Sequence, residues 1–159
     1  IGMGNWVPVA MQVIHFTGYE VPFKDIRLDD ERDRRVGHLL GTADMIAQMS
    51  DRCYLEKCRD RLFVEFVEGG LAARDEADQR PSVRFKSAED LVVRTPSFYR
   101  TAMARLEDQL AGAYRYAETH FGGRNLYIET IDKNILFAAE VARQRDLSLL
   151  RRSPPRLEE

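Results

Sequence analysis

The sequence predicts an all-α protein. Apolar residues recur at spacings of three and four over several long stretches, as on the buried side of a helix. Capping residues, prolines and glycines separate these stretches. No long alternation of apolar and polar residues indicates a strand, and no internal repeat is visible. We therefore expect a bundle of five or six helices joined by capped turns, with one longer loop.

Length and composition fit one helical domain. The chain has 159 residues, of which 44% are hydrophobic and 31% charged, so a core can form beside solvated helix faces. We expect a single domain over residues 1–147 and a disordered tail over residues 148–159, where RRSPP interrupts the helical pattern.

Charge and hydropathy exclude several classes of partner. A net charge of −2 gives no electrostatic case for binding nucleic acid or an anionic membrane. No apolar run approaches the roughly 20 residues that a bilayer requires. Cys53 and Cys58 are five residues apart and match no metal or redox motif, so we expect reduced thiols in a cytoplasmic protein.

The first helix is expected from the NWVP segment to about Thr17. Asn5 is its predicted cap, Pro8 is tolerated in the first turn, and Gly18 ends it. Its predicted core side consists of Val9, Val13, Ile14 and Phe16. A loop over residues 20–30 follows, and the acidic run at 29–31 caps the next helix.

The helix predicted over residues 31–50 is the organising element. Its expected core side consists of Val36, Leu39, Leu40, Ala43, Ile46, Ala47 and Met49. A second face aligns Gly37, Gly41, Asp44, Gln48 and Asp51. Each glycine costs roughly 1 kcal/mol relative to alanine, which favours close approach of another backbone or of a ligand. A solvated polar face with two tolerated glycines is the alternative.

Four more helices complete the predicted bundle. A helix is expected over residues 52–68, followed by a polar and mobile loop over residues 71–86. Ser87 begins a capping box before a short helix to about residue 94. Thr95 and Pro96 then begin the longest helix, to about residue 120. Gly122 and Gly123 form a turn before a last helix over residues 126–145, with Leu126, Ile128, Ile131, Ile135, Leu136 and Ala139 facing inward.

Two runs on the organising helix, LGTADM (40–45) and QMSDR (48–52), resemble the last conserved segment of the HD-type metal-dependent phosphohydrolases. The resemblance implies that Asp44 is a metal ligand, completed in the family by an upstream histidine and a His-Asp pair. The segments CYLEKCRD (53–60), FVEF (63–66), YRYAE (114–118) and HFGGRN (120–125) are similar to a bacterial branch, so the resemblance covers about residues 13–134.

The chain departs from the family pattern at its histidines. His15, His38 and His120 are the only ones, and none is followed by aspartate. The sequence also begins with Ile1. We therefore expect the C-terminal part of a longer protein, whose own residues do not complete a metal site. The resemblance also makes His15 a weak ligand candidate, with a structural histidine as the alternative.

The function implied by the resemblance is hydrolysis of a small phosphate ester with a divalent metal, without distinction between Mn, Mg, Fe, Ni and Zn. The metal would polarise a phosphoryl oxygen and activate water. Gln48, Asp51 and Arg52 would support the ligand or contact the phosphate, because a guanidinium matches phosphate oxygens. Solvated polar side chains are the alternative interpretation of these three residues.

Two other hypotheses remain open from the sequence. One is a non-catalytic regulatory or interaction domain derived from the HD fold, which the absence of a His-Asp pair favours. The other is a structural helical bundle that forms a homodimer through exposed helices. The sequence that precedes Ile1 in the natural protein would discriminate the enzyme from the interaction domain.

Overall fold

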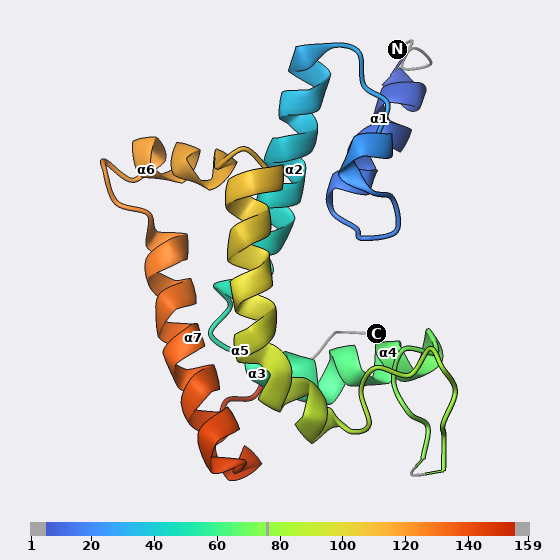
Figure 1. Ribbon diagram of the computed structural model, residues 1–159. Helices are drawn as coiled ribbons and strands as arrows, with labels where there is room; N and C mark the ends of the chain where they lie inside the picture. Colours follow the sequence, from blue (N-terminus) through green and yellow to red (C-terminus); the bar gives the residue numbers. More distant parts are fainter. Residues whose placement is uncertain (1–5, 76, 155–159) are drawn as a thin grey trace. The chain divides into compact units, whose positions relative to one another are not determined.

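The computed structural model describes residues 6–75 and 77–154, which are predominantly helical (Figure 1). The helices are α1 (Val7–Val13), α2 (Glu31–Met49), α3 (Tyr54–Lys57), α4 (Phe63–Glu68), α5 (Ala88–Ala104), α6 (Tyr116–His120) and α7 (Leu126–Gln144). Within these two ranges no strand forms, and the β pairing is an isolated bridge between Ala72 and Phe85. The predicted all-α class is confirmed.

The chain divides into two compact units. Unit 1 comprises Ile1–Ser50 and Arg100–Glu129, and unit 2 comprises Asp51–Tyr99 and Thr130–Glu159. Helices α5 and α7 each contribute residues to both units. In the part of the chain that the structure describes, no helix has the length and apolarity needed to cross a membrane.

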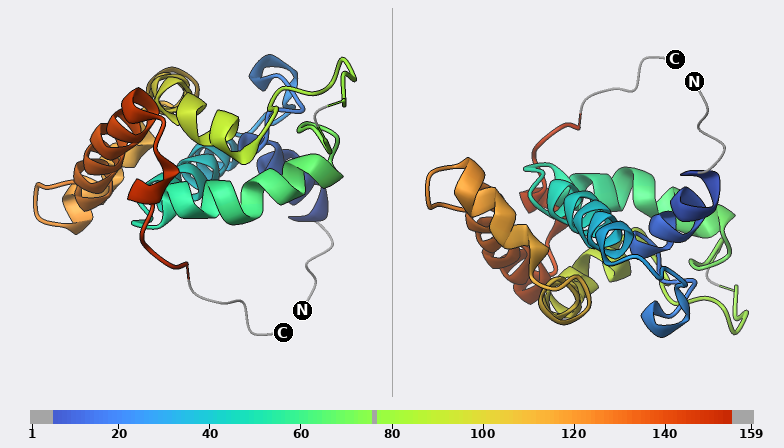
Figure 2. Two further views of the ribbon diagram at one scale, coloured as in Figure 1. Left: turned by 90° about the horizontal axis from the view of Figure 1, so that it is seen from below. Right: turned by 90° about the horizontal axis from the view of Figure 1, so that it is seen from above.

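In unit 1, α1 lies beside α2 and continues into a 3₁₀ turn, Ile14–Phe16 (Figures 1 and 2). Pro8 occupies the first turn of α1, as predicted, whereas the predicted cap Asn5 lies outside the described residues. Val13 and Phe16 are buried as expected, but Ile14 is exposed. The turn therefore faces α2 mainly through Phe16.

Helix α2 begins and ends within one residue of the prediction. Asp30 caps it, accepting a hydrogen bond from the Arg32 backbone N–H at 2.7 Å. The capping aspartate satisfies one of the free N–H groups of the first turn and its charge favours the helix dipole.

The predicted burial of α2 is partly wrong, because the glycine face packs inward. Gly37 and Gly41 are buried, and a Cβ atom at Gly41 would lie 2.4 Å from the carbonyl oxygen of Phe16. A Cβ at Gly37 would lie 2.6 Å from the Phe16 ring. Gly41 therefore allows close approach of another backbone, which was one of the two predicted uses, and Gly37 leaves room for the Phe16 ring.

The opposite side of α2 carries an exposed apolar stripe, which we define as Val36, Leu39, Leu40, Ala43 and Ala47. All five were predicted to be core, but Val36 is 53% exposed, Leu39 44% and Leu40 41%, and both alanines are exposed. The buried residues of the helix are Gly37, Gly41, Thr42, Met45, Ile46 and Met49. Hydrophobicity therefore identified Ile46 and Met49 correctly but not the stripe.

In unit 2, the helix predicted over residues 52–68 forms as α3, a π-helical turn Cys58–Leu62, and α4. The segment after α7, predicted as a disordered tail from residue 148, has a 3₁₀ turn at Leu147–Leu149 and a buried Leu150. The Arg152 backbone N–H donates to buried Glu56 at 3.1 Å. Residues 155–159 lie outside the described residues.

Helix α5 does not break at Pro96. The structure contradicts the prediction of a cap at Thr95, whose hydroxyl instead donates to the Leu91 carbonyl at 3.2 Å inside a continuous helix. Ser87 does cap the helix, because its hydroxyl accepts from the Asp90 N–H at 3.1 Å. The long helix predicted to residue 120 instead stops near Ala111, where the backbone adopts a positive φ of 54°.

Helix α7 matches its prediction in extent. Ile131 is buried as expected, together with Asn134, Ala138 and Val141. Leu126, Leu136 and Ala139 were predicted to face inward and are exposed. The inward side is therefore rotated relative to the predicted one.

Candidate functional site

Asp44 lies on α2 in unit 1 and is partly accessible. Its Oδ1 accepts a hydrogen bond from Gln48 Nε2 at 2.9 Å, one helical turn later. Because successive residues turn by about 100°, Asp44 lies about 40° from Leu40 and about 60° from Gly41 around the helix. The carboxylate therefore stands at the border between the apolar stripe and the buried glycine face, with an oriented side chain.

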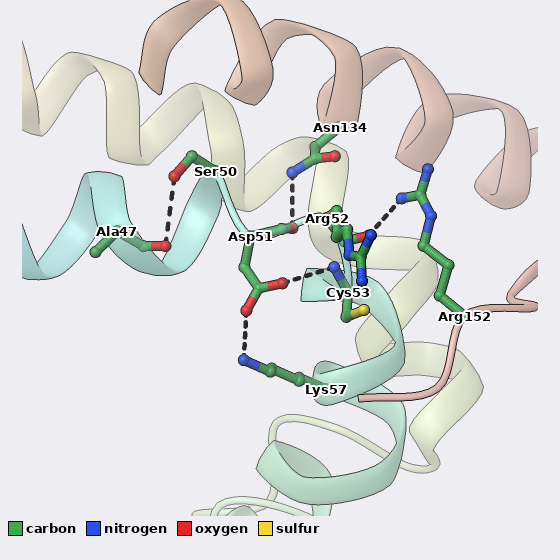
Figure 3. A network of polar contacts seen from close by, with 8 residues as sticks. All are labelled: Ala47, Ser50, Asp51, Arg52, Cys53, Lys57, Asn134 and Arg152. Atoms are coloured by element: carbon green, nitrogen blue, oxygen red, sulfur yellow. Dashed lines mark hydrogen bonds and ion pairs between the residues drawn. The ribbon is translucent and has the colours of Figure 1, made fainter. Parts of the chain in front are cut away.

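Asp51 and Arg52 belong to unit 2 and follow the end of α2. The Asp51 carboxylate accepts from the Cys53 backbone N–H at 2.7 Å and forms an ion pair with Lys57 (Figure 3). Its backbone carbonyl accepts from the Asn134 side chain at 2.9 Å. These contacts make Asp51 a structural residue that fixes the turn before α3.

The pKa of Asp51 is lowered. Burial acts in the opposite direction and is the largest single influence, but the hydrogen bonds from Lys57 and Cys53 and the charges of Lys57 and Arg52 together outweigh it. The ionised form is therefore stabilised in the folded state.

Replacing Asp51 by asparagine is expected to reduce stability in a pH-dependent way. A lowered folded pKa contributes stability above the unfolded pKa, near 3.8, and that contribution is lost as pH falls through the folded value. At pH 7 we expect a loss of about 1–2 kcal/mol, and the two proteins should converge once the pH falls below the lowered folded pKa of Asp51. Urea unfolding at several pH values measures this, with exposed Asp132→Asn as control. A constant difference across pH would contradict it.

Arg52 is exposed, and its backbone carbonyl accepts a hydrogen bond from the Arg152 guanidinium (Figure 3). Among the described residues, no carboxylate lies within ion-pair distance of its side chain. The structure thus brings Asp44 and Gln48 together in unit 1, while Asp51 and Arg52 belong to the other unit.

The histidines do not join Asp44. His15 lies in the 3₁₀ turn after α1 and is partly exposed. His38 is on α2, but about 120° around the helix from Asp44, and its ring packs edge-on against Phe16 at 5.3 Å between centroids. Burial and the charge of Arg34 lower the pKa of His38, with a smaller opposing effect of Glu31.

Over residues 6–75 and 77–154, no three His, Cys, Asp or Glu side chains are grouped closely enough to hold a metal ion. Sequence reasoning also missed two buried charged residues, Glu56 and Arg105, since a charged residue within a helical pattern normally indicates a solvated face.

Comparisons with protein-family models, with curated proteins and with solved structures found no match to this chain.

Proposed function

We propose that this chain is the C-terminal part of an HD-type metal-dependent phosphohydrolase that acts on a small phosphate ester. In this proposal Asp44 supplies one ligand to a divalent metal, and Gln48 orients its carboxylate. The remaining ligands are those that the resemblance assigns to an upstream histidine and a His-Asp pair. Asp51 has a structural role in the proposal, because its carboxylate is occupied by Lys57 and Cys53.

The position of Asp44 is the observation that carries this proposal. Its carboxylate is accessible and held by Gln48 at 2.9 Å. It borders a stripe of exposed apolar side chains, and such contiguous patches mark surfaces that contact other protein. An aligned carboxylate beside a protein-binding surface suits a helix that contributes one ligand to a site completed by another segment.

A cytoplasmic location is part of the same proposal. Cys53 and Cys58 are buried free thiols. Burial is the main cause that raises the pKa of Cys58 to about 11, so this thiol remains protonated and unreactive. Buried thiols of this kind suit a reducing compartment.

Exchange of Asp44 for alanine tests the proposal in the natural full-length protein. Loss of a group that only supports a metal ligand lowers metal affinity or activity by ~10–100-fold. Loss of a direct ligand should therefore lower metal affinity and phosphate-ester hydrolysis by more than that. Metal content, hydrolysis of p-nitrophenyl phosphate, and thermal unfolding with and without Mn²⁺ measure this. A metal at a hundredfold excess over its dissociation constant should stabilise the wild type by about 2.7 kcal/mol.

Asp132→Asn, an exposed carboxylate on α7, is the matched control and should retain wild-type metal content and turnover. Wild-type metal affinity and hydrolysis in the Asp44→Ala protein would end the assignment of Asp44 as a ligand.

A helical interaction domain is the second candidate function, and exposed apolar residues favour it. Besides the stripe on α2, the side chains of Trp6, Val7, Met11 and Ile14 are each more than half exposed on and beside α1. If the full-length protein binds no metal, and Leu39→Ser with Leu40→Ser abolishes an association seen by sedimentation, this second function replaces the first.

A further inference from the structure

The loop between α4 and α5, in unit 2, has an ordered base. The Arg84 backbone N–H donates to the Leu71 carbonyl at 2.8 Å, and the Ala73 N–H donates to the Phe85 carbonyl at 2.9 Å. The Phe85 ring stacks on Phe66 with centroids 5.5 Å apart. The loop was predicted to be a mobile excursion, and in the structure these contacts hold its two ends against the end of α4.

Asp78 organises the outer part of the loop. Its carboxylate accepts hydrogen bonds from the backbone N–H of Arg74 at 3.1 Å and from the Arg80 guanidinium at 2.7 and 2.8 Å. The Arg80 hydrogen bonds are the main reason that the pKa of Asp78 lies well below its ordinary value. The charges of Asp78 and Arg80 therefore cancel within the loop.

A cavity of about 600 Å³ that is open to solvent lies between this loop and the first turns of α5, within the ~300–1,000 Å³ range of small-molecule sites. Its charged lining residues are Asp75, Asp78, Arg80, Arg84, Lys86 and Arg94.

Positive charge predominates in the cavity. Arg94 pairs with Asp90 at 2.7 Å, as Arg80 does with Asp78. Across the described ranges, by contrast, neither Arg84 nor Lys86 has an ion-pair partner. Among the described lining residues, Arg84 and Lys86 are therefore the cations without an ion-pair partner, and Asp75, whose carboxylate accepts from the Ala77 N–H at 2.9 Å, lines the same cavity.

We propose that this cavity binds the phosphate of a small phosphomonoester, with Arg84 and Lys86 as its principal contacts. A guanidinium fork and an ammonium group together match the charge and the several acceptor oxygens of a phosphate dianion. The Arg94 guanidinium, which also lines the cavity, is paired with Asp90 and lies 5.9 Å from the centre of the Phe85 ring, so it is not one of the principal contacts. The volume suits a nucleotide-sized molecule rather than a polymer, and the site is independent of Asp44, which belongs to unit 1.

Titration of the whole chain with AMP, followed by calorimetry, tests this proposal. We expect AMP to bind and adenosine, which lacks the phosphate, not to bind. Loss of one charge-assisted contact weakens binding about tenfold, so Arg84→Gln with Lys86→Gln should weaken AMP binding at least tenfold. The Arg84 N–H can still donate to the Leu71 carbonyl in the variant, and the backbone N–H at position 86 can still donate to the Asp90 carboxylate, at 3.0 Å in the wild type. Thermal unfolding of the variant should therefore match that of the wild type.

The matched control is Lys133→Gln with Arg151→Gln, which removes the same charge from exposed positions of unit 2 outside the cavity. It should bind AMP like the wild type. Absence of AMP binding, equal binding of adenosine, or equal weakening in the control would each overturn the proposal. Binding to vesicles that contain phosphatidic acid, without binding of AMP, would assign the cations to a lipid headgroup and also overturn it.

Discussion

Replacing Gly41 by alanine is expected to lower the free energy of unfolding by about 3 kcal/mol, since overpacking of a tight contact costs about 1–3 kcal/mol and occasionally more. The same exchange in an unconstrained helix would stabilise it by about 1 kcal/mol. At Gly41 the exchange is expected to destabilise the protein instead, because the new Cβ would lie 2.4 Å from the Phe16 carbonyl oxygen and 2.9 Å from a Leu110 methyl group. The leucine side chain can move, but the backbone carbonyl cannot do so without shifting the turn.

Urea unfolding followed by circular dichroism measures this difference. Ala43→Gly, on the exposed side of the same helix, is the control, with an expected cost of about 1 kcal/mol from helix propensity alone. A Gly41→Ala protein as stable as the wild type would show that the segment around Phe16 does not pack against α2 as described.

The extent of α2 was predictable from sequence because the residues that begin and end a helix lie at its own termini. Asp30 and the acidic first turn mark its beginning, and the helical spacing correctly placed Asp44 and Gln48 on one face, where they form a hydrogen bond. The same spacing failed for Asp51, because α2 ends at Met49 and a residue beyond the helix no longer follows its periodicity. The candidate site was therefore predictable only as far as the helix itself extends.

The buried side of α2 was not predictable, because a sequence does not state which segment covers a helix. Val36, Leu39 and Leu40 have large apolar side chains, which are typical of buried positions, whereas Gly37 and Gly41 have no side chain to bury. The decisive contact is backbone proximity to Phe16, a residue more than 20 positions earlier. Hydrophobic periodicity measures side-chain area and does not register that kind of contact.

Pro96 shows a comparable limit on capping signals. Thr95 followed by proline is typical of a helix beginning, yet α5 continues through both residues. Proline removes one intrahelical hydrogen bond, and the buried Thr95 hydroxyl bonds the Leu91 carbonyl, one turn earlier. Tertiary packing of Tyr99 and Leu91, both buried, offsets the local cost.

The other large effect is expected at Arg105, a buried guanidinium that holds the segment after α1. Its Nη2 donates to the carbonyl oxygens of Phe16 at 2.9 Å and Gly18 at 2.5 Å. Its guanidinium carbon lies 3.9 Å from the centre of the Tyr19 ring, within cation–π range. Within the described part of the chain, its Nε has no hydrogen-bond partner, so one buried donor of this guanidinium remains unsatisfied.

Arg105→Met is expected to cost about 3 kcal/mol, because it leaves the carbonyls of Phe16 and Gly18 without their donor. Arg105→Lys should cost less, about 1–2 kcal/mol, since an ammonium keeps the charge but not the planar fork. Exposed Arg100→Met is the control and should stay within ~0.5 kcal/mol of the wild type. Urea unfolding measures the three, and hydrogen exchange should show faster opening of residues 14–23 in Arg105→Met alone.

Combining Gly41→Ala with Arg105→Met extends the same argument. Both changes act on the Phe16 carbonyl oxygen, one by steric contact and one by loss of its donor. Groups that share a partner are not additive, and their coupling is commonly ~0.5–3 kcal/mol. The free energy of unfolding of the double variant should therefore fall by less than the sum of the two single decreases. Once one change has displaced the Phe16 carbonyl, the other change removes an interaction that is already weakened. Strict additivity would mean that the two residues hold different structures, contrary to their shared contact.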